Sequence, residues 1–316
     1  MGNKKNIIKK PGVKTLSIHH GETFSEETGC VMPPIFSTST FKHGNKENFD
    51  YTRSGNPNFK ILENILKSIE DSKYCTVFGS GISAVTAITS TLKSGDKILC
   101  ESNLYGCTVR MFEKIFKKFG IAVFYTDFTD QENIKKIKDF QPNLIWLESP
   151  TNPLLKVLDI KLICDEANKN NIPVVLDNTF STALIQKPLE LGATLSLIST
   201  TKFINGHSDA LGGAVLTNNE EWNSKMLFSQ KALGLQPSPF DSWLITRGVK
   251  TLPLRIEQQT KSAELISKEF ENHRIIRKVL YPFNQKHPQF NLAKSQMKSG
   301  GSMITLKLNL NKASTL

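Results

Sequence analysis

Hydrophobic and polar positions follow two alternating patterns along most of the chain. Short uninterrupted apolar runs, such as Val174-Val175-Leu176, alternate with longer segments in which apolar residues recur at helical spacing. The first pattern is typical of strands buried on both faces of a sheet, and the second is typical of amphipathic helices. The patterns predict strands at 74–78, 97–100, 121–125, 144–147, 173–176, 194–198 and 214–216, and helices at 61–69, 82–92, 109–119, 130–139 and 159–170.

This alternation predicts an α/β fold. Short strands separated by helices imply right-handed crossovers, a mostly parallel sheet and helices on both of its faces. Beyond residue 237, long helices within 241–270 and strands at 276–280 and 303–308 predict a smaller α+β domain. We therefore expect an N-terminal arm over 1–60, a main domain over 61–237 and a C-terminal domain over 238–316 that is truncated at its end.

Charge and cysteine content argue against several other classes of protein. The formal net charge is +11, but the lysines are spread along predicted helices and are not grouped with stacking aromatics, so we expect no nucleic-acid partner. No apolar run reaches the roughly 18 residues of a spanning helix, and no secretory signal is visible, so we expect no membrane. The five cysteines form no CxxC pair, which favours reduced thiols in the cytoplasm and no metal site.

Polar turns follow four of the predicted strands. They are Phe78-Gly79-Ser80-Gly81, the segment 148–153 (Glu-Ser-Pro-Thr-Asn-Pro), Asp177-Asn178-Thr179 and Ser199-Thr200-Thr201-Lys202. Ligands of parallel α/β sheets bind beyond the carboxyl ends of the strands. These four turns are therefore the predicted location of the chemistry.

Three of the turns match the requirements of one cofactor, pyridoxal 5'-phosphate (PLP). Backbone N–H groups of Gly79-Ser80-Gly81, at the start of a helix, can hold a phosphate. Lys202 suits an amine that forms a Schiff base with an aldehyde, and Asp177 offers a carboxylate to a pyridinium nitrogen. Each residue alone has an ordinary structural explanation, but together they supply the contacts that PLP needs.

A dinucleotide-binding dehydrogenase is the alternative at this point. Residues 79–84 also match the relaxed fingerprint G-x-G-x-x-A, and Glu101 lies twenty residues after Gly81. That fingerprint explains neither Lys202 nor Asp177, and nothing in the sequence supplies an acid for hydride transfer.

Several longer segments resemble the Cys/Met-metabolism family of PLP-dependent enzymes, which includes cystathionine γ-synthase, cystathionine γ-lyase and methionine γ-lyase. The resemblance runs from about residue 33 nearly to the C-terminus and implies a PLP-dependent transferase fold of type I. The segments that carry it are 51–57 (YTRSGNP), 148–153 (ESPTNP), 177–180 (DNTF) and 199–209 (STTKFINGHSD).

The resemblance implies a role for each matching residue. Lys202 would hold the cofactor aldehyde and then move the substrate α-proton, and Tyr105 would stack on the ring and assist proton transfer. Asp177 would keep the ring nitrogen protonated, and His207 is interpreted as a structural turn residue. The other cofactor-binding residues would be Gly81, Ile82, Thr179, Ser199 and Thr201, together with Tyr51 and Arg53 from a neighbouring subunit. A homo-oligomer, a dimer of dimers, is therefore implied.

The implied reaction is trans-sulfuration of an amino acid, by γ-replacement or γ-elimination. Asn152 and Glu148 would lie near the substrate. Arg110 matches an arginine that cystathionine enzymes direct toward a distal carboxylate, whereas Cys107 is similar to methionine γ-lyase. Arg110 and the segment 236–241 (QPSPFD) favour a cystathionine γ-synthase or γ-lyase, with methionine γ-lyase as the alternative.

Two departures from the family pattern bear on activity. Phe203 replaces the commoner tyrosine after the lysine, with little expected consequence. The family's late R-x-S-x-G-x-E segment, which supplies the arginine for the substrate α-carboxylate, does not occur before Leu316. We therefore expect either a fragment of a longer protein or a catalytically impaired subunit that binds cofactor and assembles with full-length paralogues.

Overall fold

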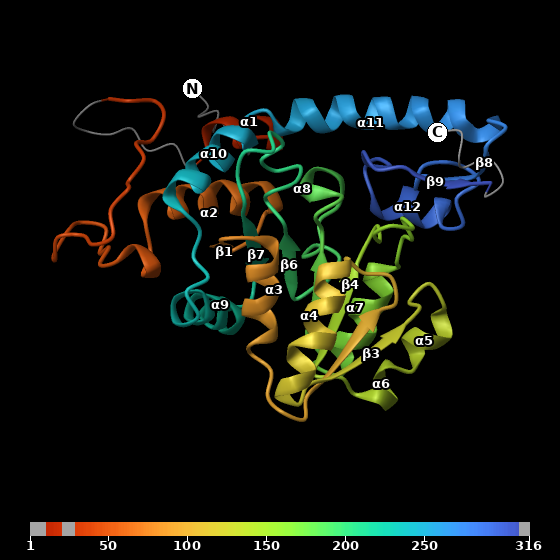
Figure 1. Cartoon of the computed structure of the whole chain (residues 1–316), viewed down its shortest axis with the longest axis horizontal. Helices are drawn as coiled ribbons and strands as arrows, with labels where there is room; N and C mark the ends of the chain where they lie inside the picture. The colour runs from red at the N-terminus through yellow and green to blue at the C-terminus, as the bar shows by residue number, and fades with distance from the viewer. Residues whose placement is uncertain (1–10, 21–28, 310–316) are drawn as a thin grey trace, which may run out of the picture.

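A seven-stranded sheet forms the centre of the computed structural model, which describes residues 11–20 and 29–309. Parts of the predicted arm and C-terminal domain, 1–10, 21–28 and 310–316, lie outside the described residues. The strand order is β1-β7-β6-β5-β4-β2-β3 (Figure 1). The strands are β1 (Tyr74–Phe78), β2 (Lys97–Glu101), β3 (Ala122–Thr126), β4 (Leu144–Glu148), β5 (Val174–Asp177), β6 (Leu195–Ile198) and β7 (Gly213–Thr217).

The predicted α/β fold is confirmed, with one reversed strand. Strands β2 to β6 pair in parallel, whereas β7 is antiparallel to both β1 and β6. Because both β1 and β6 run antiparallel to β7, these two strands point the same way. Their carboxyl ends therefore lie at the same edge of the sheet. The amino end of β7, at Gly213, lies between them.

Helices cover both faces of the sheet. One face packs against α3 (Gly81–Thr89), α4 (Gly106–Lys114) and α9 (Glu220–Ala232), and the other against α2 (Pro57–Glu70), α5 (Gln131–Lys135), α6 (Ile137–Phe140) and α7 (Ile160–Lys169). Neighbouring strand residues alternate between the two layers, as Val175 faces α3 while Val174 and Leu176 face α7. Burial on both faces explains why the central strands read as uninterrupted apolar runs, whereas the edge strand β3 is partly exposed.

Several predicted helices differ from those observed. The predicted helix 109–119 is α4 followed by the 3-10 turn η2 (Phe116–Phe119), and 130–139 is split into α5 and α6. The region 241–270 forms α10 (Pro239–Val249) and α11 (Leu252–Glu269). The helices α1 (Val13–His19), α8 (Thr182–Ile185), α9 and α12 (Phe290–Gln296) were not predicted. No helix within the described residues is long and apolar enough to cross a membrane.

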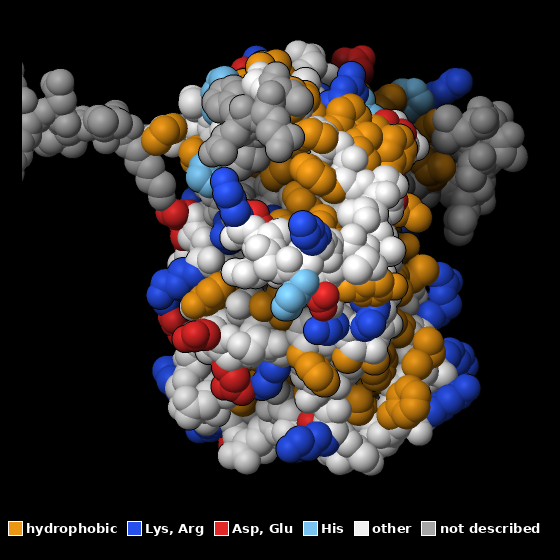
Figure 2. All heavy atoms as spheres, turned by 90° about the vertical axis from the view of Figure 1, so that its left-hand side faces the viewer, with side chains coloured by type: hydrophobic (Ala, Val, Ile, Leu, Met, Phe, Trp, Pro, Cys, Tyr) orange, Lys and Arg blue, Asp and Glu red, His pale blue; other side chains and the backbone are white. Residues whose placement is uncertain are grey.

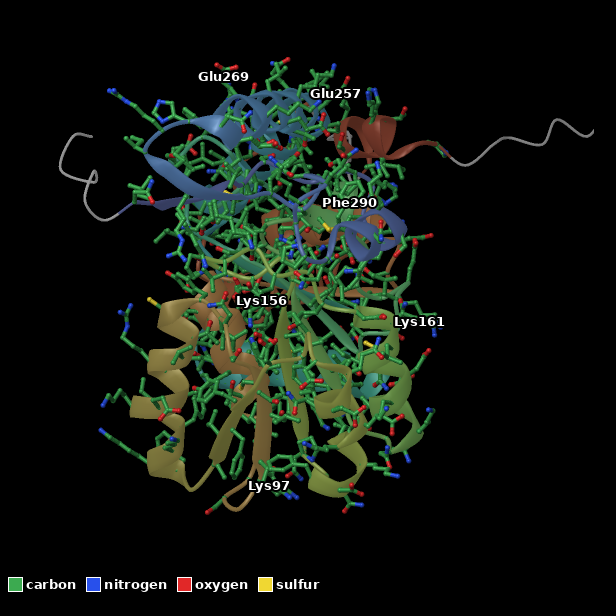
Figure 3. All side chains as sticks on the ribbon, turned by 90° about the vertical axis from the view of Figure 1, so that its right-hand side faces the viewer. Lys97, Lys156, Lys161, Glu257, Glu269 and Phe290 are labelled. Carbon is green, nitrogen blue, oxygen red and sulfur yellow. The ribbon has the colours of Figure 1, made fainter. Side chains whose placement is uncertain are left out.

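A small module packs beyond the carboxyl edge of the main sheet. In this module β8 (Ile276–Leu280) pairs with β9 (Thr305–Leu308) in antiparallel fashion, and α12 lies beside them. Figure 3 shows Phe290 of α12 beneath α11, far from Lys97 at the opposite end of the main sheet. His287 Nδ1 accepts the Gln289 N–H at 3.2 Å, so its Nε2 donates to the Leu155 carbonyl at 3.0 Å. Gln296 Nε2 donates to the Leu158 carbonyl at 2.9 Å. These bonds attach the module to the loop after β4. The predicted domain boundaries at 60 and 237 stay a prediction.

A buried carboxyl group on α2 makes the stability of this fold depend on pH. Glu70 is only 1% exposed, and burial raises its pKa to about 8 from the ordinary value of 4.5, although Lys187 offsets part of the shift. The folded chain therefore keeps a proton that the unfolded chain releases above about pH 4.5. The contribution of Glu70 to stability is therefore fully present below that pH and is lost as the pH rises toward 8.

We expect the free energy of unfolding to fall between pH 5 and 8, by up to about 1.4 kcal/mol per pH unit for this one proton. Glu70→Gln stays neutral and should flatten the decline. Urea unfolding of both proteins at pH 5, 6.5 and 8 measures the difference. Equal slopes for the two proteins would show that Glu70 does not hold the proton.

Candidate active site

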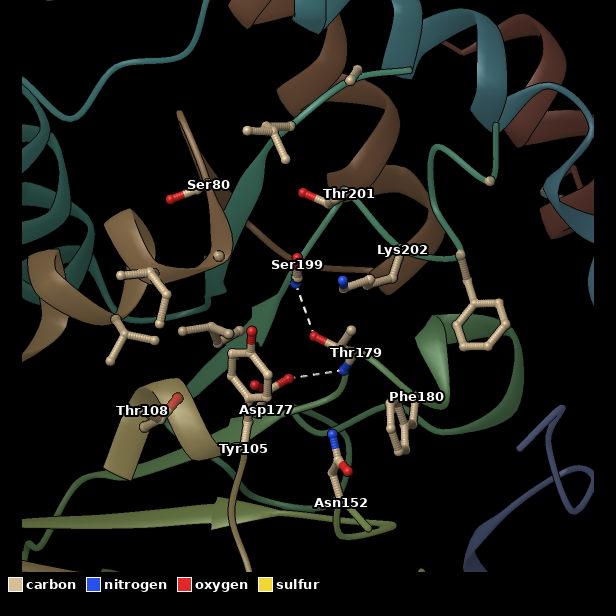
Figure 4. Close-up of a pocket in the computed structure, with 18 of the residues that line it drawn as sticks. Ser80, Tyr105, Thr108, Asn152, Asp177, Thr179, Phe180, Ser199, Thr201 and Lys202 are labelled. Atoms are coloured by element: carbon tan, nitrogen blue, oxygen red, sulfur yellow. Dashed lines mark hydrogen bonds between the residues drawn. The ribbon is translucent and has the colours of Figure 1, made fainter. Parts of the chain in front are cut away.

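The turns at the carboxyl edge of the sheet enclose one pocket of about 1070 Å³ (Figure 4). Ten of the fourteen predicted site residues line it, whereas Tyr51, Arg53, Cys107 and Arg110 do not. The ten are Gly81, Ile82, Tyr105, Glu148, Asn152, Asp177, Thr179, Ser199, Thr201 and Lys202. The sheet therefore brings together residues that are separated by up to about 120 positions in the sequence.

The start of α3 is built to bind an anion. Ser80 caps the helix, since its Oγ accepts the Ser83 N–H at 3.0 Å and its carbonyl accepts the Ala84 N–H at 3.1 Å. The N–H groups of Gly81 and Ile82 have no partner one turn earlier in the helix, and both residues line the pocket. N–H groups at a helix start, together with the helix dipole, favour a phosphate at this position.

This turn is packed against β7 so closely that a side chain cannot fit between them. A Cβ atom on Gly213 would lie 2.3 Å from the Ser80 carbonyl oxygen and 2.9 Å from the Gly81 nitrogen. These neighbours are backbone atoms, so the turn itself would have to move.

We expect Gly213→Ala to weaken binding of a phosphate-bearing cofactor by about tenfold or more, because overpacking of this kind costs about 1–3 kcal/mol. Titration of the cofactor-free protein with PLP measures the dissociation constant. Gly12→Ala is the control, since no heavy atom lies within 4 Å of its Cβ position. An unchanged dissociation constant for Gly213→Ala would show that the turn can shift without consequence.

Asp177 is held at the end of β5 by Thr179. The Thr179 N–H donates to Asp177 Oδ1 at 3.0 Å, and Thr179 Oγ1 accepts the Ser199 N–H at 2.9 Å (Figure 4). Burial raises the pKa of Asp177, while the hydroxyl and N–H of Thr179 lower it. Thr179 thus links the ends of β5 and β6 and orients the carboxyl group toward the pocket.

Lys202 extends into the same pocket from the turn after β6, and an arginine that the sequence analysis missed supports that turn. Arg255 on α11 donates to the carbonyls of Phe203 at 2.7 Å, Ile204 at 3.1 Å and Gly248 at 2.9 Å. A signal existed in the sequence, because Arg255 stands in the otherwise apolar first turn of a predicted helix. Gln259 and Met303, which line the pocket from α11 and from the segment before β9, were also not predicted from the sequence.

Tyr105 and Asn152 lie on one side of the pocket, next to Glu148. Glu148 Oε2 accepts the Tyr105 N–H at 2.8 Å, and the Asn152 N–H faces the same carboxyl group. Burial and the neighbouring Asp177 raise the pKa of Glu148, whereas these two N–H groups lower it.

Cys107 and Arg110 pair with each other on α4. Arg110 Nη2 lies 2.7 Å from Cys107 Sγ, and the Tyr105 hydroxyl and then Arg110 lower the pKa of the thiol. Tyr51 and Arg53 also lie together outside the lining, with the Arg53 guanidinium 5.4 Å from the centre of the Tyr51 ring and bonded to the Lys231 carbonyl.

The residues in the pocket fit PLP. The open N–H groups of α3 match its phosphate, buried Asp177 matches its ring nitrogen, and Lys202 matches its aldehyde. A side chain at position 81 would not fit beside this site, because its Cβ would lie 2.9 Å from Ser199 Cβ.

Comparisons with known proteins agree with this geometry. The model of the Cys/Met metabolism PLP-dependent enzyme family matches residues 14–315. A probable cystathionine gamma-synthase of Herpetosiphon aurantiacus is 40% identical over 300 residues, covering 94% of each chain. The cystathionine gamma-lyase of Dictyostelium discoideum is 39% identical over 296 residues, covering 92% of this chain and 76% of the relative.

Solved structures lead to the same family. The metB protein of Corynebacterium glutamicum superposes with a TM-score of 0.92 at 36% identity, covering 94% of this chain and 79% of that one. The cystathionine gamma synthase of Xanthomonas oryzae pv. oryzae in complex with cystathionine has a TM-score of 0.93 at 34% identity, covering 97% and 80%. The chain belongs to the Cys/Met metabolism family of PLP-dependent enzymes, and PLP is its cofactor.

Proposed function

We propose that this enzyme acts at the γ-carbon of an amino-acid substrate of the cystathionine type, by replacement or elimination. The observation that carries the proposal is that Lys202 and Asp177, from the adjacent strands β6 and β5, line one pocket. The relatives named cystathionine gamma-synthase and gamma-lyase support this choice of substrate.

Each of the main pocket residues has a separate role in the proposed reaction. When bound, PLP supplies the electron sink that makes the substrate α-hydrogen acidic. The Lys202 amine takes that proton from Cα and moves the proton at Cβ, so that the group on Cγ can leave. Asp177 would keep the ring nitrogen of the cofactor protonated, Tyr105 would contact the ring, and Asn152 would orient the substrate carboxylate.

A second subunit completes the site in this proposal. Tyr51 and Arg53 lie outside the pocket of their own chain, on the segment 29–56 that extends away from the sheet (Figure 1). The same side of the molecule carries exposed apolar residues of α9 and α10, among them Phe228 at 73% and Phe240 at 52% exposure, and Figure 2 shows hydrophobic side chains on this face. A neighbouring copy would cover this surface and bring Tyr51 and Arg53 to the phosphate.

The free thiols support a reducing location. All five cysteines are free, and Cys75, Cys100 and Cys164 are buried. Burial also raises the pKa of each of these three thiols, which keeps them unreactive. We propose that the enzyme works in the cytoplasm.

Arg110 provides a test of the substrate. We expect Arg110→Ala to raise KM for cystathionine about tenfold to a hundredfold, because a hydrogen bond to a charged group contributes about 1.5–3 kcal/mol. The KM for methionine, which has no distal carboxylate, should stay unchanged. Lys114→Ala, an exposed cation on the same helix, is the control. An equal rise for both substrates would mean that Arg110 does not bind the distal carboxylate.

Product analysis tests the function itself. The purified chain is loaded with PLP and incubated separately with cystathionine, with methionine, and with an acylated homoserine plus cysteine. New cystathionine identifies a γ-synthase, and cysteine with 2-oxobutanoate from cystathionine identifies a γ-lyase. Homocysteine with pyruvate from cystathionine, or turnover of methionine alone, would overturn the proposed preference. Lys202→Ala serves as the blank in each assay.

A further inference from the structure

Two carboxyl groups lie side by side at the carboxyl edge of the sheet, and the proposed function uses only one of them. Glu148 ends β4 and Asp177 ends β5, and the two are directly paired in the register of these strands. Their exposed fractions are 6% and 9%. In the proposed function Asp177 contacts the ring nitrogen of the cofactor, whereas Glu148 has no assigned role.

The Glu148 carboxyl group lines the pocket and accepts a hydrogen bond from the backbone. Its Oε2 accepts the Tyr105 N–H at 2.8 Å, and the Asn152 N–H faces the same carboxyl group and lowers its pKa. Tyr105 follows β2, while Asn152 belongs to the loop after β4. One carboxyl group therefore binds the Tyr105 loop while it stands at the start of the Asn152 loop, and each loop presents a side chain to the pocket.

The helix that follows Tyr105 depends on the same group. Tyr105 is the N-cap residue of α4, yet it makes no side-chain capping bond, and the first turn of α4 contains no acidic residue. A carboxylate at a helix start is favourable because it complements the helix dipole and the open N–H groups there. Glu148 supplies from β4 what α4 lacks in its own sequence.

We propose that Glu148 is a positioning residue that couples the Tyr105 loop to the Asn152 loop, and that it does not bind substrate through its charge. This inference rests on the proposed function, since Tyr105 and Asn152 are the residues that Glu148 positions. Its oxygens act as acceptors for N–H groups. The acceptor, and not the negative charge, is the part of the side chain that matters.

Glu148→Gln and Glu148→Met separate these two properties. Glutamine keeps the length and an acceptor oxygen but removes the charge, whereas methionine keeps the length and removes both. We expect Glu148→Met to lower kcat about 30-fold for cystathionine and methionine alike, with KM within about threefold, because misplaced groups at a reacting centre reduce rate. Glu148→Gln should recover kcat to within about threefold of the wild type.

The visible circular dichroism of bound PLP supplies a readout that does not require turnover. The signal reports the asymmetric surroundings of the ring, so it should weaken in Glu148→Met and be restored in Glu148→Gln. Glu70→Gln, a buried glutamate remote from the pocket, should leave both kcat and the dichroism unchanged. If the wild type turns over none of the substrates, the proposed function fails, and the dichroism still decides the role of Glu148.

Two outcomes would overturn the inference. In the first, Glu148→Met has the kcat and the dichroism of the wild type, so that neither loop needs the acceptor. In the second, Glu148→Gln and Glu148→Met raise KM equally for cystathionine but not for methionine, which would show that the charge contacts the distal ammonium group of the substrate.

Discussion

Lys202→Ala is expected to abolish the yellow colour of the PLP-loaded enzyme and to reduce turnover by at least about 10³-fold. The Lys202 amine is the group placed to hold the cofactor covalently and to move protons at Cα and Cβ. Positioned proton transfer alone contributes about 10²–10⁴-fold to a rate, and loss of covalent attachment adds to this. Absorbance in the near-visible range and product formation measure the two effects separately.

Two controls make this result specific to Lys202. Lys268→Ala removes an exposed lysine from α11 and should change neither colour nor rate. A small primary amine added to Lys202→Ala should restore part of the turnover, because it can replace the lost base. Wild-type turnover by Lys202→Ala would exclude the proposed chemistry altogether.

Asp177→Asn should lower kcat by about 10²-fold or more while the protein still binds PLP. Asparagine preserves the shape and the contact with the Thr179 N–H, but it cannot supply the negative charge that keeps the ring nitrogen protonated. The phosphate contacts at α3 are unaffected, so affinity for PLP should fall much less than kcat. Parallel measurement of kcat and of the PLP dissociation constant tests this separation.

Thr179→Val tests how much the Thr179 hydroxyl contributes to the function of Asp177. Valine keeps the volume and the N–H but removes the hydroxyl that links Asp177 to the Ser199 N–H. The loss in kcat should be smaller than for Asp177→Asn, in the range of about 5–20-fold, as expected for one hydrogen bond. An Asp177→Asn enzyme with wild-type kcat would show that the charge is not required.

Most strands could be predicted from the sequence because they are buried on both faces. Every residue of β4 and β7 is buried, so no polar position interrupts the apolar run. Strand direction has no such signal, and the reversal of β7 could not be predicted. Residues 199–212, which connect β6 to β7, form no helix that could return the chain for parallel pairing.

Helices were predicted less well where tertiary contacts override the local pattern. In α9 only four residues are buried, among them Ser229 and Gln230, so the apolar period is weak. The Gln230 amide donates to the Val77 carbonyl at 2.5 Å, a contact that depends on the finished fold. The predicted helix at 130–139 breaks at Lys136, which leaves two short helices in place of one.

The pocket residues were predictable because strand ends and glycines mark the functional edge of a parallel sheet. The roles of residues that act through another residue were not predictable from the sequence. Arg255 is about fifty positions away from the Phe203 and Ile204 carbonyls that it binds, and the sequence placed Glu148 near the substrate without indicating its bond to the Tyr105 N–H. Only the folded chain shows that these two side chains bind the backbone of the Lys202 turn and of the Tyr105 loop.

The position of β1 at the edge of the sheet has a consequence for biosynthesis. Among the strands that the structure describes, β7 is its one neighbour, so the register of Tyr74 with Thr217 joins segments more than 140 residues apart. Long-range pairing of this kind forms late, because the intervening loop must first be closed. A nascent chain on the ribosome therefore cannot assemble the phosphate-binding turn until residue 217 has emerged, and vitamin B6 capture follows synthesis of the sheet.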